Sequence, residues 1–181
     1  MEGTNLKDLN GFGFIVYDDK ERELSSKIIG TISDGTTNSF KLSFKESYSD
    51  ARILTFIPYR LKECKAAKLS DADLNIKGET IISLGKYGDL TITRIDTSKG
   101  ETKVYYKCKY GSLIAPLRIV DKESGEGINV KKWIQYAEDK GEYVVTFDKA
   151  LGDKSYTIQY QSLDDIVTVF DDLKFNVDVT K

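Results

Sequence analysis

Four acidic pairs are the residues of this chain whose types and spacing come closest to chemistry. Carboxylates can bind a hard cation such as calcium, which needs six or more oxygens converging on one point. No D-x-D-x-D-G loop accompanies the pairs, and a glycosidase would need two carboxyls at a set separation across a cleft. We interpret the acids as solvated turn residues, and predict no catalytic residue, no metal and no cofactor. The pairs are Asp18-Asp19, Asp71-x-Asp73, Asp164-Asp165 and Asp171-Asp172.

Histidine is absent, and this removes several mechanisms together. Nucleophiles activated by imidazole and nearly all zinc hydrolase sites require that residue. The two cysteines, Cys64 and Cys108, have neither metal-ligand spacing nor a CxxC arrangement. Cys108 continues the period-two pattern of Val104 and Tyr106, which predicts a small core residue. Two thiols are the plainer interpretation of the cysteines, and a disulfide between them is the alternative.

Aromatic residues are the best candidates for ligand contact. Tyr105 is predicted to point away from the apolar face of its strand, between Lys103 and Lys107. A tyrosine in that setting could stack on a sugar or a peptide, because its ring is apolar and its tip is polar. Trp133 and Tyr136 are further candidates. For all three, packing in a core or between modules is the alternative that we favour.

Charge and hydropathy exclude some classes of partner. The formal net charge is −2 among 31% charged residues, and the lysines alternate with acids rather than forming a stripe. No field therefore attracts a phosphate backbone, and we expect no nucleic acid partner. The longest apolar runs are too short to span a bilayer, so we expect no membrane contact within these residues.

A repeated strand pattern is the strongest signal in the chain. Matched residues are separated by 103 positions throughout, as residues 14 and 117 are. A constant offset over such a span predicts one supersecondary design used twice. Chance similarity between amphipathic strand pairs is the alternative. The matches are Phe14, Val16 and Asp18 with Leu117, Ile119 and Asp121, and Phe40, Leu42, Phe44 and Asp50 with Tyr143, Val145, Phe147 and Asp153.

Period-two alternation and closely spaced turn residues predict an all-β protein made of two tandem immunoglobulin-like β-sandwich modules. Residues 64–73 are the best helix candidate, with an irregular connector as the alternative, and we expect under about a tenth helix. Pro58 and Pro116 fit edge positions, where a missing N–H is tolerated. The expected strands are residues 12–17, 27–33, 39–44, 52–61, 88–95, 103–110, 113–120, 130–137, 142–147, 154–160 and 174–179.

The repeat also predicts the domain boundaries. Strands around Leu90 and Val104 precede the second copy, and their counterparts would fall at or before residue 7. We therefore predict a partial N-terminal module over residues 1–75 and a complete module over residues 76–181. Leu74-Asn-Ile resembles Phe175-Asn-Val near the chain end, so the two segments are expected to be equivalent.

Several short motifs carry a resemblance to a family. Phe40-Lys-Leu-Ser-Phe followed by Asp50-Ala-Arg-Ile-Leu-Thr-Phe-Ile-Pro-Tyr resembles a signature of certain Gram-positive surface proteins. Three further stretches are similar to the later part of those proteins: Gly88-Asp-Leu-Thr-Ile-Thr-Arg-Ile, Asp121-Lys-Glu-Ser-Gly and Asp172-Leu-Lys-Phe-Asn-Val. Those proteins cross the membrane once, carry immunoglobulin-like extracytoplasmic domains, and are often associated with regulators of extracytoplasmic-function sigma factors. The resemblance implies an outside-facing module and brings no catalytic residues.

The expected function is therefore a non-enzymatic extracytoplasmic interaction or sensing segment of a membrane-anchored bacterial protein. The anchor would lie outside these residues, and the partner would be a protein or a cell-wall ligand. The alternatives are a carbohydrate or cell-wall binding module and a structural spacer. Neither an oligomeric state nor a specific signal is predicted.

Overall fold

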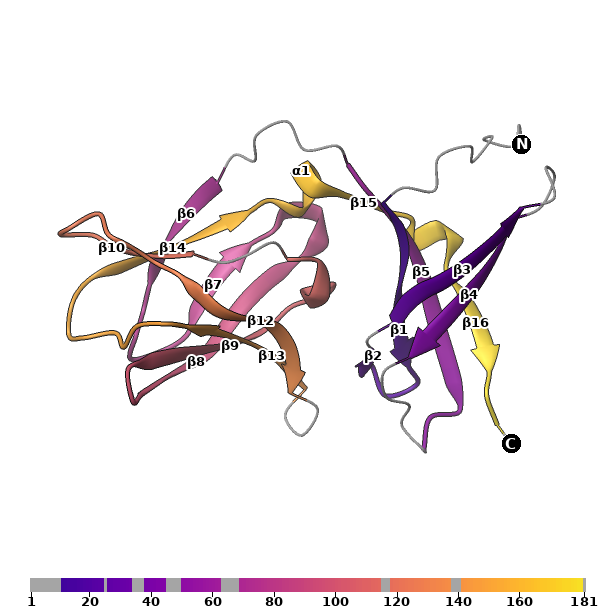
Figure 1. Cartoon of the computed structure of the whole chain (residues 1–181), viewed down its shortest axis with the longest axis horizontal. Coiled ribbons are helices and arrows are strands. Elements are labelled where there is room, and N and C mark those ends of the chain that lie inside the picture. Colours follow the sequence, from indigo (N-terminus) through magenta and orange to yellow (C-terminus); the bar gives the residue numbers. More distant parts are fainter. Residues whose placement is uncertain are drawn as a thin grey trace. The chain divides into compact units, whose positions relative to one another are not determined.

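The computed structural model is all-β, as the alternation predicts (Figure 1). It describes residues 11–24, 26–33, 38–44, 50–62, 69–114, 118–137 and 141–180, without the side chains of 31–33, 38, 40 and 133–137. Strands dominate these residues, and their only α-helix is α1 (Leu163–Ile166). The predicted low helix content is confirmed.

The chain forms two compact units, and the first is discontinuous. Unit 1 contains Met1–Lys62 and Val167–Lys181, and unit 2 contains Glu63–Ile166. These bounds differ from the predicted 1–75 and 76–181 because the last strands of the chain pair with a strand from its first third. The carboxyl-terminal segment is therefore part of unit 1.

Unit 1 consists of a five-stranded antiparallel sheet and a two-stranded hairpin. The sheet has the order β15-β5-β1-β2, with β16 also paired to β5, and the hairpin is formed by β3 and β4. The core lies between them, where Val16, Leu24, Leu54 and Phe56 are buried against the partly buried Leu42 and Phe44. The strands are β1 (Phe12–Asp18), β2 (Glu23–Leu24), β3 (Ser26–Ser33), β4 (Asn38–Phe44), β5 (Ile53–Leu61), β15 (Val167–Val169) and β16 (Phe175–Asp178).

Unit 2 has a four-stranded sheet of order β11-β10-β14-β6 and a five-stranded sheet of order β12-β13-β9-β8-β7. Buried residues alternate with exposed ones in both sheets, as expected of a sandwich. Its strands are β6 (Leu69–Leu74), β7 (Thr80–Ser83), β8 (Asp89–Ser98), β9 (Glu101–Lys107), β10 (Arg118–Asp121), β11 (Gly127–Ile128), β12 (Val130–Ala137), β13 (Glu142–Phe147) and β14 (Tyr156–Gln161), and its short 3-10 helices are Gly85–Tyr87 and Gly111–Leu113.

Most predicted strands are present, but some predicted segments differ from the observed elements. The helix candidate at residues 64–73 is replaced over its described part by β6, whose side chains alternate between exposed and less exposed positions. The predicted strand 103–110 ends at Lys107, because a turn at residues 109–110 places Tyr110 in the left-handed conformation. Cys108 therefore lies just beyond β9 with intermediate exposure, and it is not a core strand residue.

Pro58 does not lie on a sheet edge, contrary to the prediction, while Pro116 lies outside the described residues. On one side of β5, Pro58 pairs with Phe14 of β1. On the other side, β16 reaches only to Phe56 and β15 starts at Tyr59. The proline thus lies at the gap between these two pairings, where a missing N–H costs no ladder hydrogen bond.

The strand pairings repeat between the units as the sequence offset predicts. Val16 pairs with Phe56 in unit 1, and Ile119, 103 positions after Val16, pairs with Ile158 in unit 2. The β3–β4 hairpin ends with Ser26 opposite Phe44, and the β12–β13 hairpin ends with Val130 opposite Phe147. Strands β1 to β5 therefore correspond in order to β10 to β14.

The strands that follow each copy in the sequence belong to the unit of the other copy. Strand β6 follows the first copy but pairs with β14, and β15 and β16 follow the second copy but pair with β5. The registers make Leu74, opposite Tyr156, equivalent to Val177, opposite Leu54. This equivalence differs by two residues from the alignment of Leu74 with Phe175 that the sequence suggests.

Candidate interaction site

The repeated aspartates Asp18 and Asp121 close equivalent turns. Each is buried at the end of the first strand of its copy, with 3% and 7% of the residue exposed. The Oδ1 of Asp18 accepts from the backbone N–H groups of Lys20 and Arg22, both at 2.9 Å. The Oδ1 of Asp121 accepts from the N–H groups of Glu123 and Ser124. Both carboxylates are therefore Asx-turn residues with a structural role.

Cations hold the acidic turn of unit 1 together. Arg22 contacts Asp18 through Nη2 at 2.5 Å and Asp50 at 2.7 Å, and Lys20 also pairs with Asp50. These hydrogen bonds, first from Lys20 and then from Arg22, hold the pKa of Asp50 well below its usual range. In unit 2 the equivalent role falls to Lys154, whose Nζ lies 2.9 Å from Asp121 and lowers the pKa of that carboxyl.

Other acids of the four pairs contact partners that lie apart from one another. Asp71 accepts from Gln159 at 2.9 Å, and Asp164 pairs with Lys86 at 2.9 Å. Within the described part of the chain, no three acidic or cysteine side chains gather as a group that could hold a metal ion. These contacts give the carboxylates structural partners.

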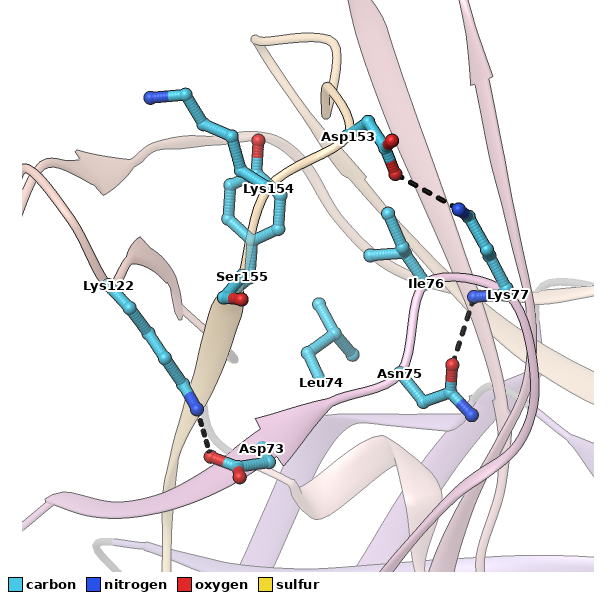
Figure 2. Close-up of a pocket in the computed structure, with 10 residues that line it drawn as sticks. Asp73, Leu74, Asn75, Ile76, Lys77, Lys122, Asp153, Lys154 and Ser155 are labelled. Carbon is cyan, nitrogen blue, oxygen red and sulfur yellow. Dashed lines mark hydrogen bonds and ion pairs between the residues drawn. The ribbon is translucent and has the colours of Figure 1, made fainter.

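A shallow pocket of about 320 Å³ lies in unit 2 beside the turn that follows β6 (Figure 2). Leu74 and Ile76 line it together with charged residues. Lys122 Nζ lies 2.5 Å from Asp73 Oδ1, and Lys77 Nζ lies 3.0 Å from Asp153 Oδ1. Both carboxylates are highly exposed, so these pairs are surface salt bridges of small net value.

The lysines that line the pocket are already paired with carboxylates. The third of them, Lys154, is held by Asp121, so each lining lysine is neutralised by a carboxylate. An anionic ligand would have to break these ion pairs.

Tyr105 lies on the outward face of β9, as predicted, because its neighbours Val104 and Tyr106 are fully buried on the other face. Lys103 and Lys107 beside it are exposed. One face of the Tyr105 ring is covered by the Arg94 guanidinium, which lies 3.6 Å from the ring centroid. A hydrogen bond that Arg94 donates to the Tyr105 side chain raises the pKa of Arg94. A stacked ligand would therefore use the other ring face.

The sheet face that carries Tyr105 also contains a buried carboxylate, which the sequence does not predict. Glu142 is only 8% exposed, and its Oε1 accepts from Thr93 at 2.7 Å. Its Oε2 and the Nε of Arg94 are both buried and make no hydrogen bond in the part of the chain described by the structure. The negative charge of Glu142 contributes to the raised pKa of Arg94.

The remaining sequence candidates are Trp133, Tyr136 and the two cysteines. Trp133 and Tyr136 belong to β12, where Tyr136 pairs with Tyr143, but their side chains lie outside the described residues. Cys64 also lies outside the described residues, so the interpretation as two thiols, with a disulfide as the alternative, remains a prediction. The Sγ of Cys108 donates to the carbonyl of Lys109 at 2.8 Å.

The most unusual surface is on unit 1, where β16 exposes an apolar face. Phe175 and Val177 have the period-two spacing of a half-buried strand, yet 47% and 39% of these residues are exposed. Phe175 stacks on the buried Phe56 with ring centroids 5.1 Å apart, and Phe44 meets Phe56 edge-on at 6.2 Å. We call Leu42, Phe44, Phe175 and Val177, together with the edge of β4 that faces away from β3, the open side.

Equivalent residues of unit 2 are covered. Val177 is 39% exposed, whereas its equivalent Leu74 is 7% exposed. Phe44 is partly buried, whereas its equivalent Phe147 is 0% exposed. The difference arises because β13 pairs with β9, followed by β8 and β7, whereas β3 and β4 form a sheet of two strands. Among the described residues, the open side is therefore the position in unit 1 that no counterpart of β7, β8 and β9 occupies.

Sequence reasoning missed the open side, although a signal was present. The alternation of Leu173, Phe175, Val177 and Val179 predicts a strand with one buried face. All four residues are between 37% and 59% exposed, so the described residues do not bury this face of the strand.

No protein-family model, no curated protein and no solved structure matches this chain. Among the described residues, no helix has both the length and the hydropathy needed to span a membrane.

Proposed function

We propose that this chain is a non-enzymatic extracytoplasmic interaction or sensing segment of a membrane-anchored bacterial protein, with immunoglobulin-like sandwich units. The location outside the cell, and a role beside a sigma-factor regulator, rest on the motif resemblance. The interaction role rests on the open side of unit 1, where the exposed Phe175 and the partly buried Phe44 both contact Phe56 and the nearby Val177 is also exposed. Exposed patches of this kind mark interaction sites in soluble proteins.

Two comparisons favour an interaction role over a spacer. A spacer has no reason to keep Phe175 and Val177 apolar, because polar residues at exposed strand positions cost little. The equivalent residues in unit 2 show that the same design covers this face when the cover is available. The open side is therefore best explained by a partner that covers it.

A site-specific photo-crosslink tests this proposal. A benzoylphenylalanine at position 177, in the complete protein in the cell that makes it, should give a discrete crosslinked product. The matched control is position 81 on β7 of unit 2, because Ile81 is 66% exposed but belongs to a complete sandwich. If position 177 gives no product, or gives the same products as position 81, the interaction role fails and the spacer alternative is favoured.

A cell-wall ligand is the second candidate, and Tyr105 carries it. Its ring lies on an outward sheet face between two exposed lysines, a setting suited to an anionic polymer containing sugars. Co-sedimentation with purified wall polymer should then be lost in Tyr105→Ala and kept in Ile81→Ala. Retention of both variants on the polymer would contradict this candidate. A failure of the parent chain and both variants to bind would contradict it too.

A further inference from the structure

Unit 2 shows what occupies the position that is open in unit 1. The edge of β13 that faces away from β12 pairs antiparallel with β9. In that ladder, Val145 pairs with Val104 and Phe147 pairs with Thr102. Strand β8 then pairs with the far edge of β9, so a β-hairpin completes the sheet.

The corresponding edge in unit 1 is the edge of β4 that faces away from β3. Strand β4 corresponds to β13, and no described strand other than β3 pairs with it. Beyond this edge, Phe175 and Val177 continue the apolar face on β16. An edge strand beside an exposed apolar face is a ready template for a further strand.

We infer that the open side binds a β-hairpin of another polypeptide, whose second strand, like β9 on β13, pairs antiparallel with the outer edge of β4. This inference rests on the proposed interaction role and names the kind of partner. Only an extended strand satisfies the row of backbone N–H and C=O groups along β4, which a helix or a loop would leave unpaired.

The pairing of β9 with β13 specifies the chemistry of the occupant. In the same register, the incoming strand places an apolar residue opposite Leu42, as Val104 lies opposite Val145. It places a small residue opposite Phe44, as Thr102 lies opposite Phe147. Its alternate residues point to solvent and are polar. The first strand of the hairpin, in the position of β8, covers Phe175 and Val177 with its apolar face.

Hydrogen exchange with a hairpin probe tests the inference. The probe is a synthetic peptide of residues 89–107, the β8–β9 hairpin of unit 2. On saturation, the amides of residues 38–44 should exchange at least about tenfold more slowly, because they gain hydrogen bonds or cover. Residues 142–147 should not change, since β13 is already paired on both edges. The control peptide carries Val104→Asp and should leave the exchange rates unchanged.

A tethered probe removes the dependence on the folding of an isolated peptide. Residues 79–114 are duplicated before residue 11 of the full chain, so that the added hairpin precedes β1 as β7, β8 and β9 precede β10. A short linker raises the effective concentration to the millimolar range. Residues 38–44 should then be protected, and the same fusion with Val104→Asp in the added copy should not protect them.

The outcomes separate this inference from the proposed function. If the tethered copy leaves the exchange of residues 38–44 unchanged while unit 1 is folded, the hairpin inference is overturned. The interaction role then stands only if position 177 still gives its crosslink. A concentration-dependent dimer that protects residues 38–44 without any probe would identify a second copy as the occupant and would also overturn the inference.

Discussion

Truncation of Phe147 and of its equivalent Phe44 should have unequal effects on stability. Phe147 is fully buried in unit 2, so Phe147→Ala should cost about 3–5 kcal/mol through lost transfer energy and a cavity. Phe44 is only partly buried and makes an edge-on contact with Phe56. Phe44→Ala should therefore cost about 1–2 kcal/mol, because less apolar area is removed from water in the native state.

The difference of about 2 kcal/mol corresponds to roughly a thirtyfold difference in the ratio of folded to unfolded unit. Native-state hydrogen exchange measures the free energy of unfolding in each unit separately, with amides of β1 and β5 as probes for unit 1 and amides of β10 and β14 for unit 2. The exposed residue Ile81 gives the control, since Ile81→Ala should be nearly neutral. Equal losses for Phe44→Ala and Phe147→Ala would refute the claim that the inner face of β4 lacks cover.

Two further predictions concern each unit alone. Gly111→Ala should destabilise unit 2 by about 1–3 kcal/mol, because an added Cβ would lie 2.1 Å from the ring of Tyr143, and unchanged denaturant unfolding would contradict this packing. Because the bonds from Lys20 and Arg22 lower the pKa of Asp50, they stabilise unit 1 above the unfolded-chain pKa of about 3.9, and this stability is lost as the pH falls toward the folded-state value. Asp50→Asn should therefore flatten the acid side of the stability profile of unit 1, and a profile as steep as that of the parent chain would count against the ion cluster.

The repeat and most strands are predictable from the sequence because their signals are local. Alternation along Phe12–Asp18 and the buried aspartate at its end recur at Arg118–Asp121, and both segments form the first strand of their copy. The outward position of Tyr105 follows from the same alternation. These features depend only on which face of a strand is apolar.

The pairing of the last strands of each copy with the other unit is not predictable in this way. Strand β6 has Ala72 and Leu74 at period-two spacing, as strand β16 has Phe175 and Val177, so alternation alone would place either strand beside β5 or β14. Which pairing forms depends on the long-range path of the chain, which periodicity does not contain. The domain bounds, the equivalence of Leu74 with Val177 and the open side all depend on that path. They could therefore be found only from the strand registers.

Amide exchange in the chain alone measures the central claim most directly. If the outer edge of β4 is unpaired, alternate amides of residues 38–44 should exchange quickly, while those bonded to β3 are protected. In β13, residues 142–147 should be protected at consecutive positions, because β9 and β12 pair with its two edges. Consecutive protection along residues 38–44, equal to that of residues 142–147, would contradict an incomplete first sandwich.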